Sequence, residues 1–139
     1  ALDLEEGARA DLPGGIFSGG KLPIALVADE ALEFLRAVDH LFGVRPLVYG
    51  GQALHWWLSQ THPNLADDFR EFPLWLASYS HEPLMPVDRR GNAFPWREWT
   101  IWQHTSGAQV KGITGDVDSN LFRGDAAALA EFCARSKVC

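Results

Sequence analysis

The sequence predicts a single α/β domain. Short, strongly apolar segments of strand length alternate with segments whose apolar residues recur at helical spacing. A chain of 139 residues with 47% hydrophobic and 22% charged residues has the size and composition of one globular domain. Such a chain is long enough to bury a core without metals or many disulfides. The expected order is strand, helix, strand, helix, strand, then two strands without an intervening helix, and a closing helix.

The first expected strand carries a period-2 alternation over residues 1–5. Its two leucines point to one side, and Asp3 and Glu5 point to the other. The continuous apolar strands that follow predict a sheet buried on both faces.

The clearest expected helix covers residues 29–42, with an apolar stripe on one face, Asp29 as its N-cap and Gly43 as its stop. The other expected elements are strands over 45–50, 73–79, 98–105 and 116–122, a hairpin arm over 110–113, helices over 53–60 and 125–135, loops over 7–22 and 80–96, and a linker or brief extended piece over 23–27.

Charge and motif content exclude several functional classes. The net charge of −6 argues against a nucleic-acid binder and against a polybasic membrane anchor. No apolar run reaches the length of a membrane span, and the sequence has no P-loop, dinucleotide fingerprint or Gly-x-Ser-x-Gly elbow. The scattered histidines and the two cysteines lack metal-ligand spacing, so neither a metal nor a cofactor is expected. Cys133 and Cys139 fit either a tail disulfide or two separate thiols.

Two pairs of carboxylates are the candidates for chemistry. Asp3 and Glu5 project from the same side of an expected strand, and neighbouring carboxylates raise the pKa of one member. A carboxyl group that keeps its proton near neutral pH is what glycoside cleavage requires of a general acid. The alternative is a solvated strand end. Asp116 and Asp118 repeat the spacing, either as a turn-forming segment or as the site of an unrelated α/β enzyme.

Aromatic residues are the second candidate feature. The chain has six tryptophans but only three lysines. An indole ring can stack on the apolar C–H face of a sugar, although core packing is the ordinary role of such residues.

Five segments together resemble the family 25 glycoside hydrolases, the lysozymes or muramidases of the Chalaropsis type. The first segment, Leu2–Glu5, resembles the family's Asp-x-Glu strand. The fourth segment, Trp99–Thr105, resembles its Trp-x-x-Trp-Gln-Tyr-Thr strand, with His104 in place of the tyrosine. The third segment, Leu74–Tyr79, resembles the family's Leu-Trp-Ile-Ala-x-Tyr strand. The last segment, Gly112–Phe122, resembles its closing Gly-x-Val-Asp-x-Asn-x-Phe segment. In chain order the segments are Leu2–Glu5, Pro46–Tyr49, Leu74–Tyr79, Trp99–Thr105 and Gly112–Phe122.

The resemblance implies an irregular TIM-like (β/α)5(β)3 barrel whose second half this chain supplies. It implies hydrolysis of the β-1,4 bond between N-acetylmuramic acid and N-acetylglucosamine in peptidoglycan, with retained configuration and help from a substrate acetamido group. The catalytic residues carried over are Glu5 as general acid, Asp3 as its strand partner and Asp118 as the carboxylate of the last strand. The substrate-binding residues carried over are Tyr49, Tyr79, Trp102, Gln103 and Asn120.

The sequence departs from the family at its beginning. The family's first strand carries a further aspartate in an Asp-Val-Ser-x-x-Gln-Gly setting, and no such segment occurs here. We therefore expect one partial catalytic domain, residues 1–139, whose open sheet edge is covered by an N-terminal half or by a second copy. Glycan strands are the expected partner, and no signal peptide is visible, although secreted, periplasmic or cell-wall action is expected. The competing hypothesis is a non-catalytic peptidoglycan-binding relic.

Overall fold

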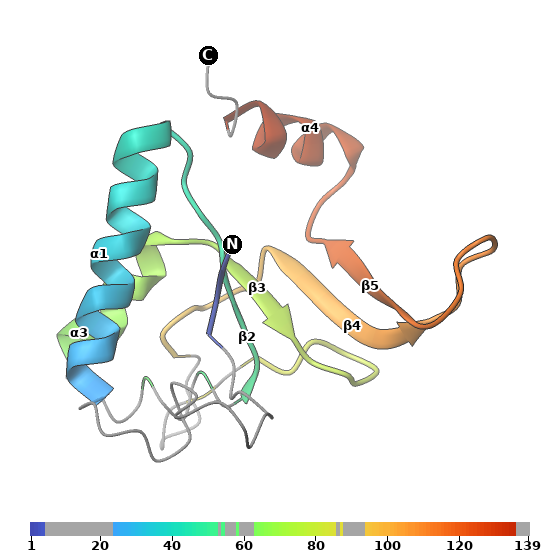
Figure 1. The fold of residues 1–139 in the computed structure, drawn as a ribbon, viewed down its shortest axis with the longest axis horizontal. Coiled ribbons are helices and arrows are strands. Elements are labelled where there is room, and N and C mark those ends of the chain that lie inside the picture. Colours follow the sequence, from blue (N-terminus) through green and yellow to red (C-terminus); the bar gives the residue numbers. More distant parts are fainter. Residues whose placement is uncertain are drawn as a thin grey trace.

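The computed structural model describes residues 1–4, 24–52, 54, 58, 63–85, 87 and 94–135. These residues form a mixed α/β fold around one five-stranded sheet (Figure 1). The predicted α/β class is thus confirmed. The expected loop over 7–22, most of the expected helix over 53–60 and Glu5 lie outside the described residues.

The strands follow one another across the sheet in chain order. The first four are parallel neighbours, and the last two form an antiparallel hairpin. Parallel neighbours need crossover connections: α1 lies between β1 and β2, α3 lies between β2 and β3, and the described residues between β3 and β4 contain no helix. The strands are β1 (Leu2–Asp3), β2 (Val48–Gly50), β3 (Leu74–Ala77), β4 (Ile101–Ala108) and β5 (Val117–Phe122).

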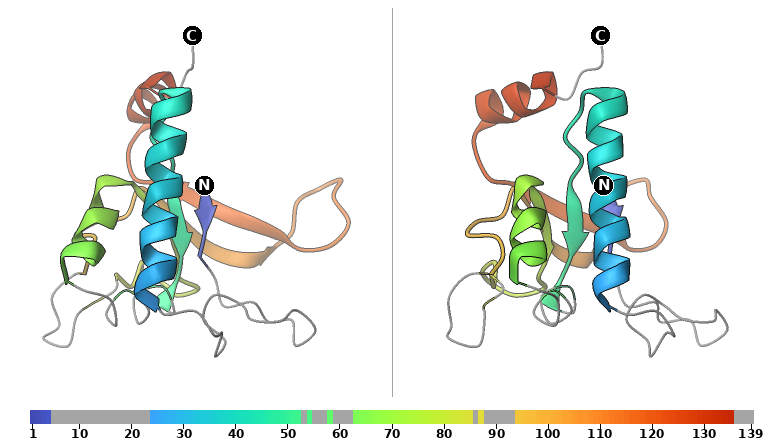
Figure 2. Two further views of the ribbon diagram at one scale, coloured as in Figure 1. Left: turned by 60° about the vertical axis from the view of Figure 1, so that its left-hand side comes forward. Right: turned by 90° about the vertical axis from the view of Figure 1, so that its left-hand side faces the viewer.

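Helices α1 (Ile24–Phe42) and α3 (Pro63–Asp68) cover the same side of the sheet (Figure 2). The α1 helix buries Ala28, Leu32 and Leu35, which are spaced to lie on one helical face. These side chains join the strand residues of the hydrophobic core. From the strands come Leu4, Val48, Leu74 and Leu76, and from the crossover segments come Leu54, Leu58, Ala66, Phe69, Phe72 and Trp96.

The sheet is fully buried on only one side, contrary to the expectation from its apolar strands. In β2 and β3, buried residues alternate with partly exposed ones. Val48 and Leu74 face the helices, whereas their neighbours Tyr49 and Trp75 face the other way. The expectation of a sheet buried on both faces was wrong because large aromatic residues in a strand suggest core packing, whereas Tyr49 and Trp75 lie on the half-exposed face.

The α1 helix starts earlier than its sequence predicts. Residues 24–27 belong to it, so the expected linker or extended piece is wrong, and Asp29 lies inside the helix instead of capping it. A short apolar run is compatible with either strand or helix, because periodicity cannot separate the two at that length. The C-terminal end is as predicted: Gly43 has φ 61° and donates its N–H to the carbonyl oxygen of Asp39 at 2.9 Å.

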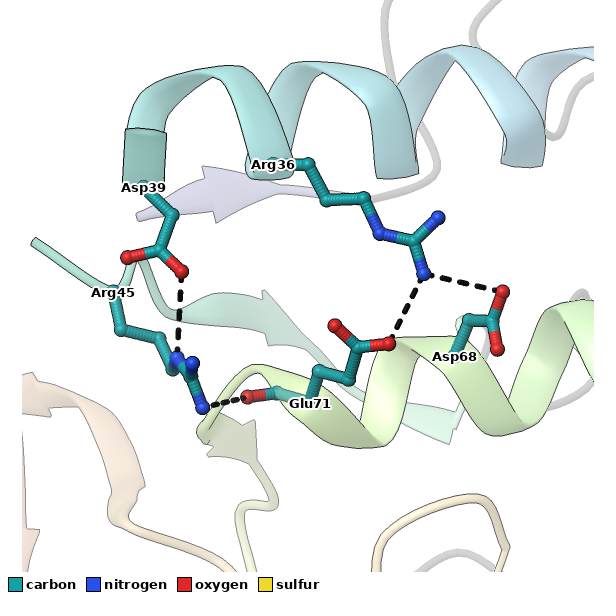
Figure 3. A network of polar contacts seen from close by, with 5 residues as sticks. All are labelled: Arg36, Asp39, Arg45, Asp68 and Glu71. Atoms are coloured by element: carbon teal, nitrogen blue, oxygen red, sulfur yellow. Dashed lines mark hydrogen bonds and ion pairs between the residues drawn. The ribbon is translucent and has the colours of Figure 1, made fainter. Parts of the chain in front are cut away.

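A segment that the sequence analysis leaves unassigned forms α3 and a 3-10 turn, η1 (Phe69–Glu71). Arg36 of α1 forms ion pairs with a carboxylate at the end of α3 and with another in η1 (Figure 3). Its Nη2 lies 3.0 Å from Oε1 of Glu71 and 3.2 Å from Oδ2 of Asp68. The hydrogen bond to Glu71 is the main reason why the pKa of Arg36 is raised. These half-exposed ion pairs fix the relative position of α1 and η1 more than they stabilise the fold.

The β4–β5 hairpin differs from its prediction at the turn. The expected arm over 110–113 is wrong, because β4 continues through Ser106 and Gly107 to Ala108. The chain reverses instead over residues 109–116, where Gly112 and Gly115 have φ values of 92° and 97° that favour glycine. The hairpin projects beyond the rest of the sheet (Figure 1).

The last helix, α4 (Ala126–Arg135), has no buried residue. Asp125 caps it, since Oδ1 of Asp125 accepts a hydrogen bond from the N–H of Ala128 at 2.8 Å. Phe132 packs on Phe122 of β5 with ring centroids 5.5 Å apart.

The sheet formed by the described strands is open: β1 and β5 are its edges, and it does not close into a barrel. Among the described helices, none combines the length and the apolar character needed to cross a lipid bilayer.

Candidate functional site

The side of the sheet opposite the helices carries most of the predicted site residues; we call it the polar face. Its members come from strand positions that lie side by side. Asp3 pairs with Tyr49, and Tyr49 pairs with Trp75, so these three side chains project from the same side. Across the hairpin Gln103 pairs with Asn120.

Gln103 is the centre of a hydrogen-bonded group on the polar face. It is only 3% exposed, and its Oε1 accepts two hydrogen bonds. The hydroxyl of Tyr49 donates one at 2.6 Å, and the hydroxyl of Tyr79 donates the other at 3.0 Å. The structure therefore brings together three residues to which the family resemblance gives a substrate-binding role, Tyr49 of β2, Tyr79 just after β3, and Gln103 of β4.

A second contact links β3 to β5 across the strand between them, β4. Nε1 of Trp75 donates a hydrogen bond to Oδ1 of Asn120 at 2.8 Å. The same indole packs edge-on against the ring of Tyr49, with centroids 5.3 Å apart. Trp75 also lies on the polar face, although the sequence resemblance does not place it among the substrate-binding residues. The signal for it is the alternation within β3, where Trp75 stands between two buried leucines and so points to the opposite side.

The predicted carboxylates lie at both edges of the sheet. Asp3 is an exposed residue of β1, and Asp118 is an exposed residue of β5, two positions before Asn120 and therefore on the same side of the strand. Three strands separate these two edges. Asp116 precedes β5, and its Oδ1 accepts a hydrogen bond from Nε2 of Gln109 at 2.5 Å, within the hairpin.

Glu5 lies outside the described residues, one position after Leu4. The backbone N–H of Leu4 donates to the carbonyl oxygen of Tyr49 at 3.1 Å, so the chain remains beside β2 up to this point. Glu5 as general acid stays a prediction.

Trp102 occupies a different environment from its neighbour Gln103. It pairs with the buried Leu76, and its Nε1 donates to the carbonyl oxygen of Ser78 at 2.7 Å. Its ring contacts those of His104 and Trp99, with centroids 5.6 Å and 6.1 Å away. Successive residues of a strand point to opposite sides, so the Trp102 indole does not join the Tyr49–Gln103 group.

Neither a metal cluster nor a paired cysteine is part of this site. The described ranges contain no group of three or more His, Cys, Asp or Glu side chains arranged to hold a metal ion. Cys133 is exposed on α4, and Cys139 lies outside the described residues, so the tail disulfide stays a prediction.

Comparisons with known proteins agree with the motifs. Residues 1–113 match the family described as glycosyl hydrolases family 25. The uncharacterized protein YegX of Escherichia coli strain K12 is 34% identical over 113 residues, which is 81% of this chain and 36% of that protein. Lysozyme M1 of Streptomyces globisporus is 40% identical over 58 residues, 41% of this chain and 17% of that protein.

Solved structures show the same fold. The lysozyme of Streptomyces coelicolor superimposes with a TM-score of 0.72 at 21% identity, over 98% of this chain and 56% of that one. The muramidase of Trichobolus zukalii has a TM-score of 0.63 at 26% identity, over 94% of this chain and 53% of that one. The chain thus spans about a third of the curated E. coli relative and about half of the structural neighbours. On the family match over residues 1–113, this chain belongs to the glycosyl hydrolases of family 25.

Proposed function

We propose that this chain supplies part of the catalytic domain of a muramidase. The reaction is hydrolysis of the β-1,4 bond between N-acetylmuramic acid and N-acetylglucosamine in peptidoglycan. The observation that carries the proposal is the polar face, where the Tyr49 hydroxyl is hydrogen-bonded to Gln103 and the Tyr49 ring packs on Trp75, in a member of a glycoside hydrolase family. Flat aromatic rings beside amide groups suit a sugar, which has apolar C–H faces and polar edges.

Glu5 is the proposed general acid. It stands two residues after Asp3, and a like charge at this spacing favours a protonated carboxyl. Glu5 gives its proton to the leaving O4 oxygen as the C1–O4 bond breaks and the substrate's own acetamido oxygen bonds to C1. Water then attacks C1, the acetamido oxygen leaves, and the Glu5 carboxylate takes the proton from the water. Asp3 and Asp118 are proposed to stabilise the positive charge that develops at the sugar ring.

A closed irregular barrel is the proposed complete architecture. An exposed strand edge presents unpaired backbone groups, and the described sheet has such edges at β1 and β5. The structural neighbours are almost twice as long as this chain, which leaves room for the strands that would close the sheet. We propose that an N-terminal half or a second copy provides them, and that the assembled protein acts at the cell wall.

The test is the release of reducing ends from purified peptidoglycan by the complete natural polypeptide that contains these 139 residues. Glu5→Gln should abolish turnover, because an amide cannot donate the proton, and should leave folding unchanged. Glu6→Gln is the matched control, since it removes the same charge at the adjacent position. Turnover that persists in Glu5→Gln contradicts the assignment.

A second candidate function is glycan binding without catalysis. The observation that favours it is the polar face itself, whose aromatic rings and hydrogen-bonded amide suit a sugar independently of Glu5. Saturable binding to insoluble peptidoglycan, without release of reducing ends, would support this alternative. Release of reducing ends that depends on Glu5 would exclude it.

A further inference from the structure

The loop that joins β4 to β5 has no role in the proposed reaction, yet it is held in a defined shape; we call residues 109–116 the hairpin tip. Nε2 of Gln109 donates a hydrogen bond to Oδ1 of Asp116 at 2.5 Å, which joins the two ends of the hairpin tip. The backbone N–H of Ile113 donates to the carbonyl oxygen of Val110 at 3.0 Å, which closes the turn between them. These hydrogen bonds organise the hairpin tip before any ligand binds, so a ligand pays less of the cost of ordering it.

The hairpin tip stands beyond the carboxyl ends of the parallel strands. Ala77, the last residue of β3, pairs with Gln103, and β4 continues from there to Ala108. At about 3.3 Å per residue, the hairpin tip begins roughly 15 Å beyond the level of Gln103. Figure 1 and the left view of Figure 2 both place the loop on the side of the sheet away from α1 and α3, which is the side of the polar face.

The exposed side chains of the hairpin tip are two aliphatic groups and a cation. Val110 is 46% exposed and Ile113 is 54% exposed. Lys111 is also exposed, and it forms no ion pair within the described ranges. By contrast, every described arginine except Arg97 is paired with a carboxylate. Exposed apolar side chains gathered beside an unpaired cation, on a loop with a defined shape, indicate a contact surface.

The composition of the hairpin tip favours a peptide over a sugar as its partner. Residues 109–116 include no aromatic residue, and aromatic rings are the side chains that stack on the faces of sugars. Aliphatic side chains beside a lysine match a ligand with methyl groups and a carboxylate. The peptide stem on the lactyl group of N-acetylmuramic acid has both, since it contains alanine and carboxylates. Four or five extended residues span about 15 Å, which is the reach needed from the level of Gln103 to the hairpin tip.

We infer that the hairpin tip binds the peptide stem of peptidoglycan while the glycan strand lies on the polar face. The inference rests on the proposed function and deepens it, because it names a second part of the substrate. Val110 and Ile113 contact alanine methyl groups, and Lys111 pairs with a carboxylate of the stem. The hairpin tip therefore lowers the KM for glycan strands that carry peptides and leaves kcat unchanged, since it binds a part of the substrate that does not react.

The test compares two forms of the same soluble glycan strands, one with its peptide stems and one from which an amidase has removed them. Release of reducing ends by the complete natural polypeptide gives KM and kcat for each form. The wild type should have a KM about tenfold lower for the strands with stems. The triple variant Val110→Ser, Lys111→Gln and Ile113→Ser should raise that KM about tenfold and leave both kcat and the kinetics on stripped strands unchanged.

Arg97→Gln is the matched control, because Arg97 is an exposed cation that has no ion pair in the described part of the chain either. It should leave both KM values unchanged. Lys111→Gln alone should raise the KM for strands with stems about threefold at low salt and less in 1 M salt. This single variant decides the question if circular dichroism shows that the triple variant does not fold.

Equal KM values of the wild type for the two forms of strand overturn the inference and leave the proposed function standing. A folded triple variant that keeps the wild-type preference, or that loses activity equally on both forms, also overturns the inference alone. A wild type that cleaves neither form overturns the inference and the proposed function together.

Discussion

Trp75 and Asn120 are hydrogen-bonded across an intervening strand: Nε1 of Trp75 donates to Oδ1 of Asn120 at 2.8 Å. Trp75 belongs to β3 and Asn120 to β5, and β4 lies between them. The two strands lie about 9.5 Å apart, twice the spacing of neighbouring strands, and the length of the Trp75 side chain lets it reach across β4.

The first prediction concerns this contact. A double-mutant cycle with Trp75→Phe and Asn120→Ala should give a coupling energy of about 0.5–1.5 kcal/mol, the net value of one hydrogen bond. Urea denaturation of the four proteins measures it. The control cycle combines Trp99→Phe with Asn120→Ala and should be additive. Additivity in the Trp75 cycle as well would show that the hydrogen bond contributes nothing.

The second prediction concerns the two tyrosines that hold Gln103. Tyr49→Phe or Tyr79→Phe alone leaves one phenol on Oε1, so each should reduce the affinity for the peptidoglycan glycan strand by less than about twofold. The double variant leaves the Gln103 amide without either phenol contact and should reduce affinity about tenfold. Calorimetric titration with the wild type as reference measures both effects. Two single losses that simply multiply to give the double loss would contradict a shared role of the two tyrosines in holding Gln103.

The third prediction concerns the close approach at Gly50. A Cβ at this position would lie 2.6 Å from Cδ2 of Leu54 and 3.3 Å from the carbonyl oxygen of Leu4. Gly50→Ala should therefore lower the free energy of unfolding by about 1–3 kcal/mol, as overpacked core substitutions do. Gly107→Ala is the control, because its Cβ would meet nothing nearer than Oγ1 of Thr105 at 3.8 Å. Chemical denaturation should show a change within about 0.5 kcal/mol for the control, and equal effects at both positions would contradict the packing argument.

The fourth prediction concerns Arg36 and its two carboxylates. Arg36→Met should lower the free energy of unfolding by at most about 1 kcal/mol, since the ion pairs are half-exposed. The difference should shrink in 1 M salt, where screening is strong. The pKa of Arg36 is raised, so its contribution is fully present below the unfolded value and is lost only as the pH rises through the folded value. Arg36 stays charged between pH 5 and 9, so its own titration should not change the stability difference between wild type and Arg36→Met in this range.

Arg97→Met is the control for that experiment. Arg97 is exposed, and among the described residues it forms no ion pair. Its replacement should change the unfolding free energy by less than about 0.5 kcal/mol at either salt concentration. A loss at Arg36 that is insensitive to salt would indicate packing of the aliphatic stem as the cause.

Local sequence patterns predicted the helices and strands whose apolar residues recur with a clear period. They failed where the same residues are compatible with two different backbone conformations. Helix α1 was recognisable from its apolar stripe and from Gly43, but its first turn was not, because a short apolar run fits strand and helix alike. The turn of the hairpin was misplaced because Gly107 looks like a turn residue in sequence, whereas the backbone that actually reverses is at Gly112 and Gly115.

The sequence by itself determined the α/β class, the family and the residue types that carry the proposed chemistry, since these depend on periodicity and on ordered motifs. Only the tertiary structure decided which of these residues meet. Strand register puts Tyr49, Tyr79 and Gln103 in contact, although Tyr49 and Gln103 are 54 residues apart, and it sends Trp102 to the other side of the sheet. The physical reason is that strand pairing fixes the side on which each residue projects, and a shift of one residue would reverse every one of them.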